Sequence, residues 1–246
     1  FQGAAGTVTV NGAQTVTGLQ FVTDGYSLQN GTAGSLNLVN GSLGNATVRV
    51  DPNATATIGV ALNGAGTLGK YDTGTLVLNA ANGYTGGTAL NGGKIVVGND
   101  AELGTGVLTA ADGTALDSNT AVTLGNDVVL NGGLNLVGSN ALTLGGVIAG
   151  TGTLTKNGLA DVTLSGSNTF SGIFDVASGS LTTLSGAALG NNATVNLAGG
   201  AALNLGASGS LASLTGSGTA LIGTGNTLSL GGNNVSSTFA GILSGD

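Results

Sequence analysis

The sequence of 246 residues contains no cysteine, methionine, tryptophan or histidine, and only one proline. The absence of cysteine excludes disulfide frameworks and thiolate metal sites. Without histidine, the many serines lack the usual general base that would activate a nucleophile. The aromatic residues number only three tyrosines and five phenylalanines, so we do not expect a core of large interlocking side chains.

Charged residues are also scarce, at 6% of the chain, whereas apolar residues make up 41%. This balance excludes disorder of the highly charged kind. The 49 glycines follow no three-residue period, which excludes collagen. With a net charge of −7, the few basic residues cannot form a stripe that follows nucleic-acid phosphates. The basic residues are Arg49, Lys70, Lys94 and Lys156.

Short runs with apolar residues at alternate positions recur along the chain, and each is followed by Gly, Asn or Asp. The longest glycine-free window, Asn45–Ile58, contains Pro52 and has no helical periodicity. The chain is therefore predicted to be all-β. The predicted strands include Thr7–Val10, Ser35–Leu38, Thr47–Val50, Thr75–Leu78, Lys94–Val97, Val122–Leu124, Val128–Leu130, Val162–Leu164, Ile173–Val176, Thr194–Leu197, Leu203–Leu205 and Thr227–Leu230.

An internal repeat organises the sequence: Gly150–Leu184 matches Gly64–Gly98 without a gap at an offset of 86 residues. A fixed internal period is the signature of a repeat architecture. We therefore divide the chain into N-terminal coils at residues 1–63, a first repeat at 64–149 and a second repeat at 150–246. The second repeat carries an insertion at 233–241, followed by the start of a third. The matched pairs include Lys70/Lys156, Asn82/Asn168, Gly86/Gly172 and, in kind, Tyr84/Phe170.

Eight Asn-Gly pairs allow two folds. Between alternating strands they are typical of antiparallel hairpins, but Asn and Gly also suit solenoid corners where φ is positive. The period favours the solenoid, since it divides into about four coils of ~21–22 residues. We predict a parallel β-helix of roughly eleven coils spaced ~4.8 Å apart. Leu76 and Leu78, like their counterparts Val162 and Leu164, are expected to point inward.

One motif resembles a nucleotide-binding loop. Gly64–Lys70 contains G-x-G-x-x-G followed by lysine. A phosphate site requires these glycines to open a helix, whereas here another strand is predicted, and Thr155 replaces the third glycine in the second copy. We interpret the motif as a turn.

Acidic residues are densest at Asp100, Glu102, Asp112, Asp117 and Asp127. Three interpretations are open: solvated coil corners, weak Ca²⁺ binding, or the acid/base pair of a polysaccharide-degrading enzyme. The first is favoured because the cluster has no recognisable ligand motif. We predict no catalytic, cofactor or metal site.

The aromatic residues Tyr71, Tyr84, Phe170 and Phe174 are the candidates for a sugar-stacking patch. Tyr84 and Phe170 occupy equivalent repeat positions. A structural role at a coil corner is therefore the favoured interpretation.

The pattern G-x-G-x-L-x-K-x-G-x-G-T-L-x-L-x-G-x-N-x-Y-x-G-G-T is well matched by Gly64–Thr88 and more loosely by Gly150–Phe174. It resembles the autotransporter-associated β-strand repeat of passenger domains in bacterial type V secretion. The resemblance implies a right-handed parallel β-helix that is exported through the periplasm to the bacterial cell surface or secreted. It implies no particular ligand, because the repeat is scaffold.

We therefore expect a surface-displayed or secreted passenger rod, acting as an adhesin or structural stalk rather than an enzyme. Its expected partners are molecules of a host or neighbouring cell, adjacent coils of a longer chain, and other copies bound end to end. The alternatives are a β-helical polysaccharide-degrading enzyme and a self-assembling surface fibre. Because the sequence starts in the middle of a strand and ends where a third copy of the repeat strand would begin, we also expect it to be a piece of a longer β-helix.

Overall fold

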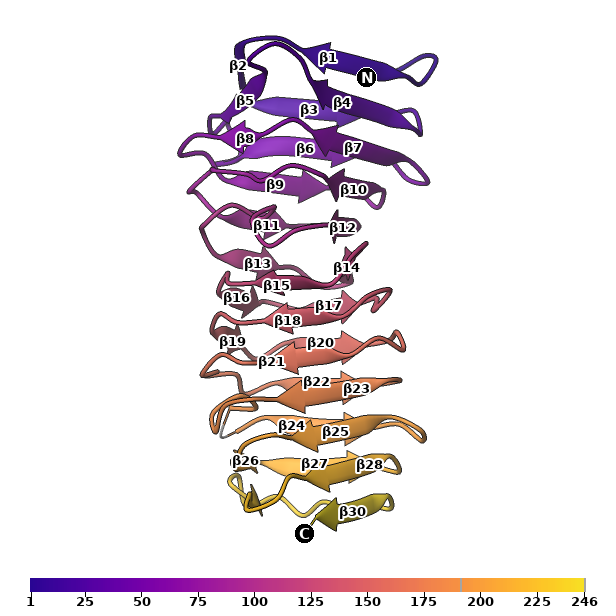
Figure 1. Ribbon diagram of the computed structural model, residues 1–246, viewed down its shortest axis with the longest axis vertical. Coiled ribbons are helices and arrows are strands. Elements are labelled where there is room, and N and C mark those ends of the chain that lie inside the picture. The colour runs from indigo at the N-terminus through magenta and orange to yellow at the C-terminus, as the bar shows by residue number, and fades with distance from the viewer. Residues whose placement is uncertain (191, 246) are drawn as a thin grey trace. The chain divides into compact units, whose positions relative to one another are not determined.

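The computed structural model describes residues 1–190 and 192–245, and every regular element within them is a β-strand (Figure 1). No helix long and apolar enough to cross a membrane occurs in this part of the chain. The strands form two compact units, Phe1–Val122 and Thr123–Asp246, and β15 (Val122–Leu124) lies at the division between them.

Unit 1 is built from three parallel sheets, each of which receives about one strand per turn of the chain. The first contains, in order, β1 (Thr7–Val10), β4 (Tyr26–Asn30), β7 (Thr55–Gly59), β10 (Thr75–Leu78), β12 (Lys94–Val97) and β14 (Thr114–Ser118). The second contains β3 (Gly18–Phe21), β6 (Ala46–Val50), β9 (Leu68–Tyr71), β11 (Thr88–Leu90) and β13 (Leu108–Ala110). The third contains β2 (Ala13–Val16), β5 (Ser35–Leu38) and β8 (Leu62–Asn63).

Unit 2 repeats this plan with parallel pairing. One sheet contains β17 (Gly133–Leu136), β20 (Thr153–Lys156), β22 (Ile173–Val176), β24 (Thr194–Leu197) and β27 (Ser213–Gly216). Another contains β18 (Leu142–Leu144), β21 (Val162–Leu164), β23 (Ser180–Thr183), β25 (Ala202–Leu205), β28 (Thr219–Ile222) and β30 (Ile242–Gly245). Two shorter pairs complete the unit, β16 (Val128–Leu130) with β19 (Ile148–Gly150) and β26 (Gly209–Leu211) with β29 (Leu228–Leu230).

The predicted parallel β-solenoid is confirmed. Over the described residues the longest sheets give six turns in unit 1 and six in unit 2, close to the roughly eleven expected. All twelve strands named from the sequence are present, nine of them with the same bounds. Strand positions were predictable because inward and outward residues alternate in many of the strands, as the burial of Leu76, Leu78, Val162 and Leu164 shows.

The predicted coil length was slightly too long. Leu76 pairs with Ile95 and Leu154 with Phe174, so a turn takes 19 or 20 residues at these points. One early turn is longer, since Tyr26 pairs with Ala56. The sequence offset of 86 residues is therefore not a whole number of turns. The repeat is better described as two strands, a corner and two further strands.

The Asn-Gly pairs lie at solenoid corners rather than in hairpins, but the expected reason applies to few of them. Among the described residues only Gly12 and Gly64 of the eight pairs have positive φ, at 63° and 98°. At others of the eight pairs, glycine is needed because a Cβ would clash with a neighbouring turn. A Cβ on Gly31 would lie 2.2 Å from Asn11 Oδ1, and one on Gly83 would lie 2.8 Å from Asn63 Oδ1. Glycine lets the asparagine of one turn lie against the backbone of the next.

Candidate functional site: the repeat corner

A buried lysine holds the corner of each repeat. The Lys70 side chain is fully buried at the end of β9, and its Nζ donates to the carbonyl oxygens of Tyr71, Asp72 and Gly92 at 2.8, 2.8 and 3.1 Å. Because Gly92 belongs to the following turn, one ammonium group ties two turns together. A lysine suits this position because it has three donors and a long apolar stem.

The second repeat uses its lysine in the same way. Lys156 is buried, and its Nζ donates to Gly158 O at 2.6 Å and to Ser178 O at 2.9 Å. These acceptors lie 86 residues after Asp72 and Gly92, so the repeat preserves the contact geometry as well as the lysine. Burial lowers the pKa of Lys156, and the nearby Asp161 carboxylate opposes that shift.

An asparagine bridges three successive turns at the next corner. Asn82 is buried, its Oδ1 accepts from Leu62 N at 2.8 Å, and its Nδ2 donates to Glu102 O at 2.6 Å. The side chain thus satisfies backbone groups that the strands leave unpaired on either side.

Asn168 repeats this arrangement in unit 2. Its Oδ1 accepts from Ile148 N at 2.7 Å, and its Nδ2 donates to Ala188 O at 2.5 Å. All three positions of the bridge are therefore conserved between the two copies at the same offset. An internal repeat that preserves hydrogen bonds as well as residue types indicates that the corner is a structural unit.

The aromatic residues fill the corner interior rather than forming a sugar-stacking patch. Tyr84 is fully buried, and its hydroxyl lies 2.6 Å from Thr88 Oγ1. In the second copy phenylalanines stand at both positions, and the Phe170 and Phe174 rings lie 4.6 Å apart. The contact between the Tyr84 and Thr88 hydroxyls in the first copy is thus replaced by a contact between two aromatic rings in the second. The predicted structural role is confirmed, and the patch interpretation is wrong for these three because no ligand reaches a buried ring.

Tyr71 also belongs to the structure. Its hydroxyl accepts a hydrogen bond from Asn45 Nδ2 at 3.0 Å, and the residue is only partly exposed at the end of β9. The Gly64–Lys70 motif likewise opens no helix: residues 64–67 form the predicted turn, and residues 68–70 already belong to β9. Gly66 lets this turn approach the preceding one, since a Cβ there would lie 2.5 Å from Leu38 O.

The aromatic and glycine part of this corner occurs a third time, within residues 233–241, which we interpreted from the sequence as an insertion. Ala240 N donates to Gly216 O at 2.8 Å, as Ser171 N donates to Gly150 O at 3.1 Å. A Cβ on Gly241 would meet the Phe239 ring at 2.6 Å, the distance found between Gly172 and Phe170. The sequence signal for this third copy is the segment Thr-Phe-x-Gly-Ile, which residues 169–173 and 238–242 share. An offset of 86 residues does not reveal this third copy, because Gly216 follows Gly150 by 66 residues and Phe239 follows Phe170 by 69.

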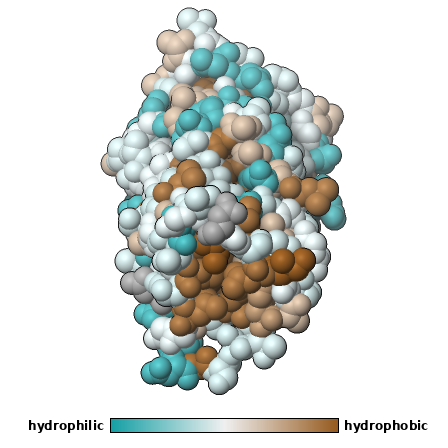
Figure 2. All heavy atoms as spheres, turned by 60° about the horizontal axis from the view of Figure 1, so that its bottom comes forward, coloured by the Kyte–Doolittle hydropathy of each residue, from teal (hydrophilic) through white to brown (hydrophobic). Residues whose placement is uncertain are grey.

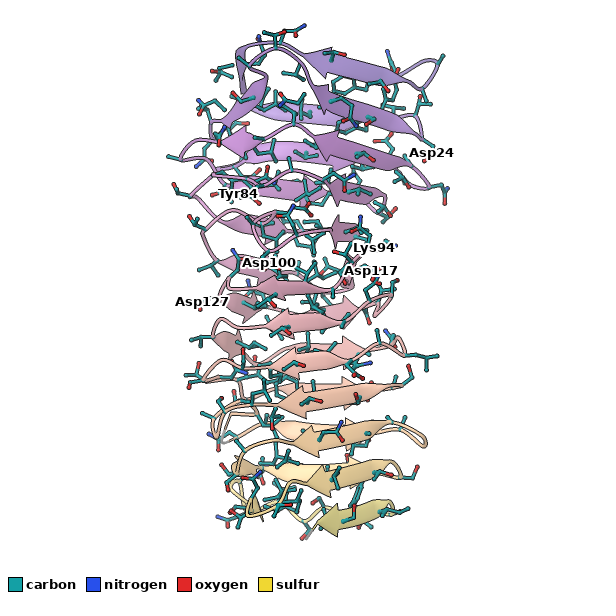
Figure 3. All side chains as sticks on the ribbon, viewed as in Figure 1. Asp24, Tyr84, Lys94, Asp100, Asp117 and Asp127 are labelled. Atoms are coloured by element: carbon teal, nitrogen blue, oxygen red, sulfur yellow. The ribbon has the colours of Figure 1, made fainter. Side chains whose placement is uncertain are left out.

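The acidic residues do not converge. Among the described residues no group of three or more potential metal ligands lies together. Within unit 1, Figure 3 shows Asp24, Asp100 and Asp117 at separate places, and Asp24 lies well apart from the other two. Asp112 lies in the exposed turn before β14. In unit 2, the Asp127 Oδ1 accepts from Val147 N at 2.7 Å.

Several of these carboxylates accept backbone hydrogen bonds. The Asp24 Oδ1 accepts from Thr55 N at 2.7 Å, and the Asp117 Oδ1 accepts from Ser118 N at 2.9 Å. Glu102 is buried, and its carboxylate accepts from Gly98 N and, at 2.7 Å, from Asn99 Nδ2. Burial raises the pKa of Glu102, against the effect of hydrogen bonds from the backbone amides of Gly98 and Asn99. Asp100, Asp112 and Asp127 are exposed, as expected for solvated corners. That interpretation is wrong for Glu102 and Asp117, which are buried because backbone amides and neighbouring side chains cover them.

We predict that the protein has no tight Ca²⁺ site. The carboxylates are spread apart and several are engaged by backbone amides, so they do not offer the six to eight oxygens, roughly, that Ca²⁺ prefers. Titration calorimetry of the protein with CaCl₂ is expected to show no stoichiometric binding at micromolar concentration. A site of submicromolar affinity would contradict the prediction and return the acidic residues to consideration as ligands.

We also predict that Lys70 makes stability rise with pH in the alkaline range. Burial lowers the pKa of Lys70 from 10.5 to about 8, although the Asp72 carboxylate opposes the shift. Between these values the unfolded chain binds the proton more tightly than the folded chain, so the free energy of unfolding increases with pH. Denaturant midpoints of wild type and Lys70→Met, measured from neutral pH to above pH 10.5, should diverge across this window. If the midpoints of the two proteins change in parallel with pH, Lys70 is not the group that causes the pH dependence.

Comparisons with known proteins agree with this geometry. A family model described as passenger-associated-transport-repeat matches residues 68–97 and 154–183, the two segments that carry the lysine and asparagine corners. The adhesin BmaC autotransporter of Brucella suis biovar 1 (strain 1330) is 40% identical over 139 residues. The match covers 52% of this chain and 4% of the relative. No solved structure matches. The chain thus contains repeats of the kind found in autotransporter passenger proteins, as its resemblance predicted.

Proposed function

We propose that the chain is a segment of an autotransporter passenger, exported through the periplasm and displayed on the bacterial surface or secreted. There it serves as an adhesin or as the stalk that presents one. The observation that carries this proposal is the pair of passenger-associated repeats, whose lysine, asparagine and aromatic positions build the same corner in each copy. The similarity to a protein named as an adhesin supports the same role.

A polar ladder on unit 2 is the surface best suited to contact a partner. Asn196 Nδ2 donates to Asp175 Oδ1 at 2.7 Å, and Thr215 Oγ1 donates to Asn196 Oδ1 at 3.2 Å, across β22, β24 and β27. Beside the ladder, the Thr194 hydroxyl lies 2.9 Å from the hydroxyl of the buried Ser213, which helps to hold it in place. Polar side chains already held by their neighbours lose little entropy when a glycan or protein binds.

Adhesion to immobilised cell-surface glycans and proteins tests this role. Beads coated with the full chain are expected to bind at least one such surface, and Asn196→Lys should reduce binding by interrupting the ladder. Asn204→Lys on β25 is the matched control, since Asn204 also hydrogen bonds to the preceding turn, at 3.4 Å to Thr182. Failure of wild type to bind any surface contradicts the adhesin role. Equal loss in both variants contradicts the placement of the contact surface.

We infer that this segment has no catalytic activity of its own. A β-helical glycosidase requires two facing carboxylates, ~5–10 Å apart, flanking the scissile bond. Here Asp24, Glu102, Asp117 and Asp127 accept hydrogen bonds from backbone amides instead. Release of reducing ends from a panel of polysaccharides would contradict this inference and favour the degrading-enzyme alternative.

We further predict that a polypeptide of residues 1–246 self-associates. Apolar side chains gather at the β30 end of unit 2 (Figure 2), where Leu221, Leu230, Ile242 and Leu243 are between 48% and 64% exposed. In unit 1 an open apolar hollow beside β1 is lined by Phe1, Val8, Val10 and Leu36, among others. Uncovered apolar surface next to unpaired strand edges promotes association.

Light scattering tests this prediction. The apparent mass is expected to grow with concentration, and Leu243→Lys should suppress the growth by placing charge in the apolar surface. Leu159→Lys is the control, because Leu159 is 83% exposed at a side corner of unit 2. A mass that stays constant at all concentrations would contradict self-association, and suppression by both variants would contradict its assignment to β30.

A further inference from the structure

Asn-Gly bonds are open to a spontaneous reaction in which the backbone nitrogen attacks the side-chain amide. The glycine nitrogen loses its proton and forms a bond to the asparagine Cγ, while the Cγ–Nδ2 bond breaks and ammonia leaves. Water then opens the resulting cyclic imide, to aspartate at one carbonyl or to isoaspartate at the other. Glycine favours the first step because it has no Cβ to obstruct the approach. The eight Asn-Gly pairs are therefore a set of potential modification sites, and the fold decides which of them react.

At four of the pairs the nucleophile is held in a hydrogen bond. The glycine N–H donates to a backbone carbonyl at Gly12, Gly31, Gly41 and Gly83, over distances of 2.8 to 2.9 Å. The Asn82–Gly83 pair is protected further, since the Asn82 amide is buried and both of its polar atoms are hydrogen bonded. Attack at these pairs requires the bond to break first.

Asn157–Gly158 is arranged differently. Asn157 is exposed at the corner between β20 and β21, and none of the hydrogen bonds of the described residues uses Gly158 N. The Asn157 Nδ2 donates to Asn135 Oδ1 at 3.1 Å, but this bond is exposed to solvent, unlike those of the buried Asn82 amide. The Ser178 hydroxyl donates to Asn157 O, the carbonyl oxygen of the peptide bond that contains the nucleophilic nitrogen. When that nitrogen loses its proton, negative charge spreads onto this oxygen, so a donor already in place stabilises the reactive form.

We propose that Asn157 is a site of spontaneous deamidation, promoted by the Ser178 hydroxyl. This inference is independent of the adhesin role. It has a structural consequence, because Gly158 O accepts a hydrogen bond from the buried Lys156 ammonium. Isoaspartate adds a methylene to the backbone immediately before Gly158 and displaces that carbonyl. Deamidation at this position therefore loosens the lysine corner of the second repeat.

Two other asparagines provide internal comparisons. Asn30 is exposed like Asn157, but Gly31 N donates to Val10 O at 2.9 Å, so this pair isolates the effect of a bonded nucleophile. Asn91 is exposed, and Gly92 N is likewise absent from the hydrogen bonds of the described residues, which also show no hydroxyl on Asn91 O. Asn91 thus isolates the effect of Ser178.

The test is incubation of the full chain in neutral buffer, followed by protease digestion and mass spectrometry that separates asparagine, aspartate and isoaspartate peptides. We expect conversion to be fastest at Asn157, slower at Asn91, and slower at Asn30 than at Asn157 by about tenfold, the effect of one broken hydrogen bond. Ser178→Ala should slow Asn157 severalfold and leave Asn91 in the same molecules unchanged. Circular dichroism of the Ser178→Ala protein checks separately that it remains folded.

Three results would overturn the proposal. If Asn157 converts no faster than Asn30, the geometry of Gly158 does not select the site. If Ser178→Ala leaves the rate at Asn157 unchanged, the hydroxyl does not promote the reaction. A synthetic peptide spanning residues 150–165 gives the rate without the fold, and an Asn157 rate far below that reference also contradicts the proposal.

Discussion

Replacing Phe170 with Ala is expected to lower the free energy of unfolding by about 3–5 kcal/mol. Phe170 is 1% exposed, and its ring packs against Phe174 at 4.6 Å, so truncation removes buried apolar surface and leaves a cavity. The neighbouring turns are fixed by strand pairing on both sides and have little freedom to collapse into the space. Urea denaturation followed by circular dichroism measures the change.

Phe239→Ala is the matched control for this prediction. Phe239 has the same contact with its glycine, Gly241, but is only half-buried, so less apolar surface is lost on truncation. We expect it to cost less than half as much as Phe170→Ala. Equal effects would show that burial by the following turn does not determine the contribution of the aromatic residue.

Lys70→Met is expected to lower the free energy of unfolding by about 2–4 kcal/mol near neutral pH. Methionine retains the apolar stem but leaves the carbonyl oxygens of Tyr71, Asp72 and Gly92 without their shared donor. Removing a buried charge returns part of the desolvation penalty, which keeps the effect below the sum of three charged hydrogen bonds.

Lys94→Met is the control for the lysine variant. Lys94 lies on the partly exposed face of β12, and we expect a change within about 0.5 kcal/mol. Chemical denaturation of both variants at neutral pH makes the comparison. A Lys70→Met protein as stable as wild type would show that the ammonium does not hold the corner together.

The interior strands were largely determined by the sequence. Alternation along Thr75–Leu78, Lys94–Val97 and Ile173–Val176 places one set of residues inward, and a strand shifted by one residue would bury its polar set instead. The same alternation of inward and outward residues recurs from turn to turn, so the strand positions follow from the local sequence pattern alone. The passenger repeat was also recognisable, because it depends on the spacing of Gly64, Lys70 and Asn82 and of their later counterparts.

Only the tertiary structure decided what the polar residues of the repeat do. Nothing in the sequence near Lys70 indicates that its ammonium reaches Gly92, because the contact exists only once the next turn is stacked in register. The same holds for Asn82, whose partners Leu62 and Glu102 each lie 20 residues away. The acidic residues were ambiguous for the same reason: whether carboxylates converge on an ion or support separate corners depends on their turns and faces. Local pattern fixes which residues point inward, whereas contacts between turns depend on exact turn lengths, which vary here between corners.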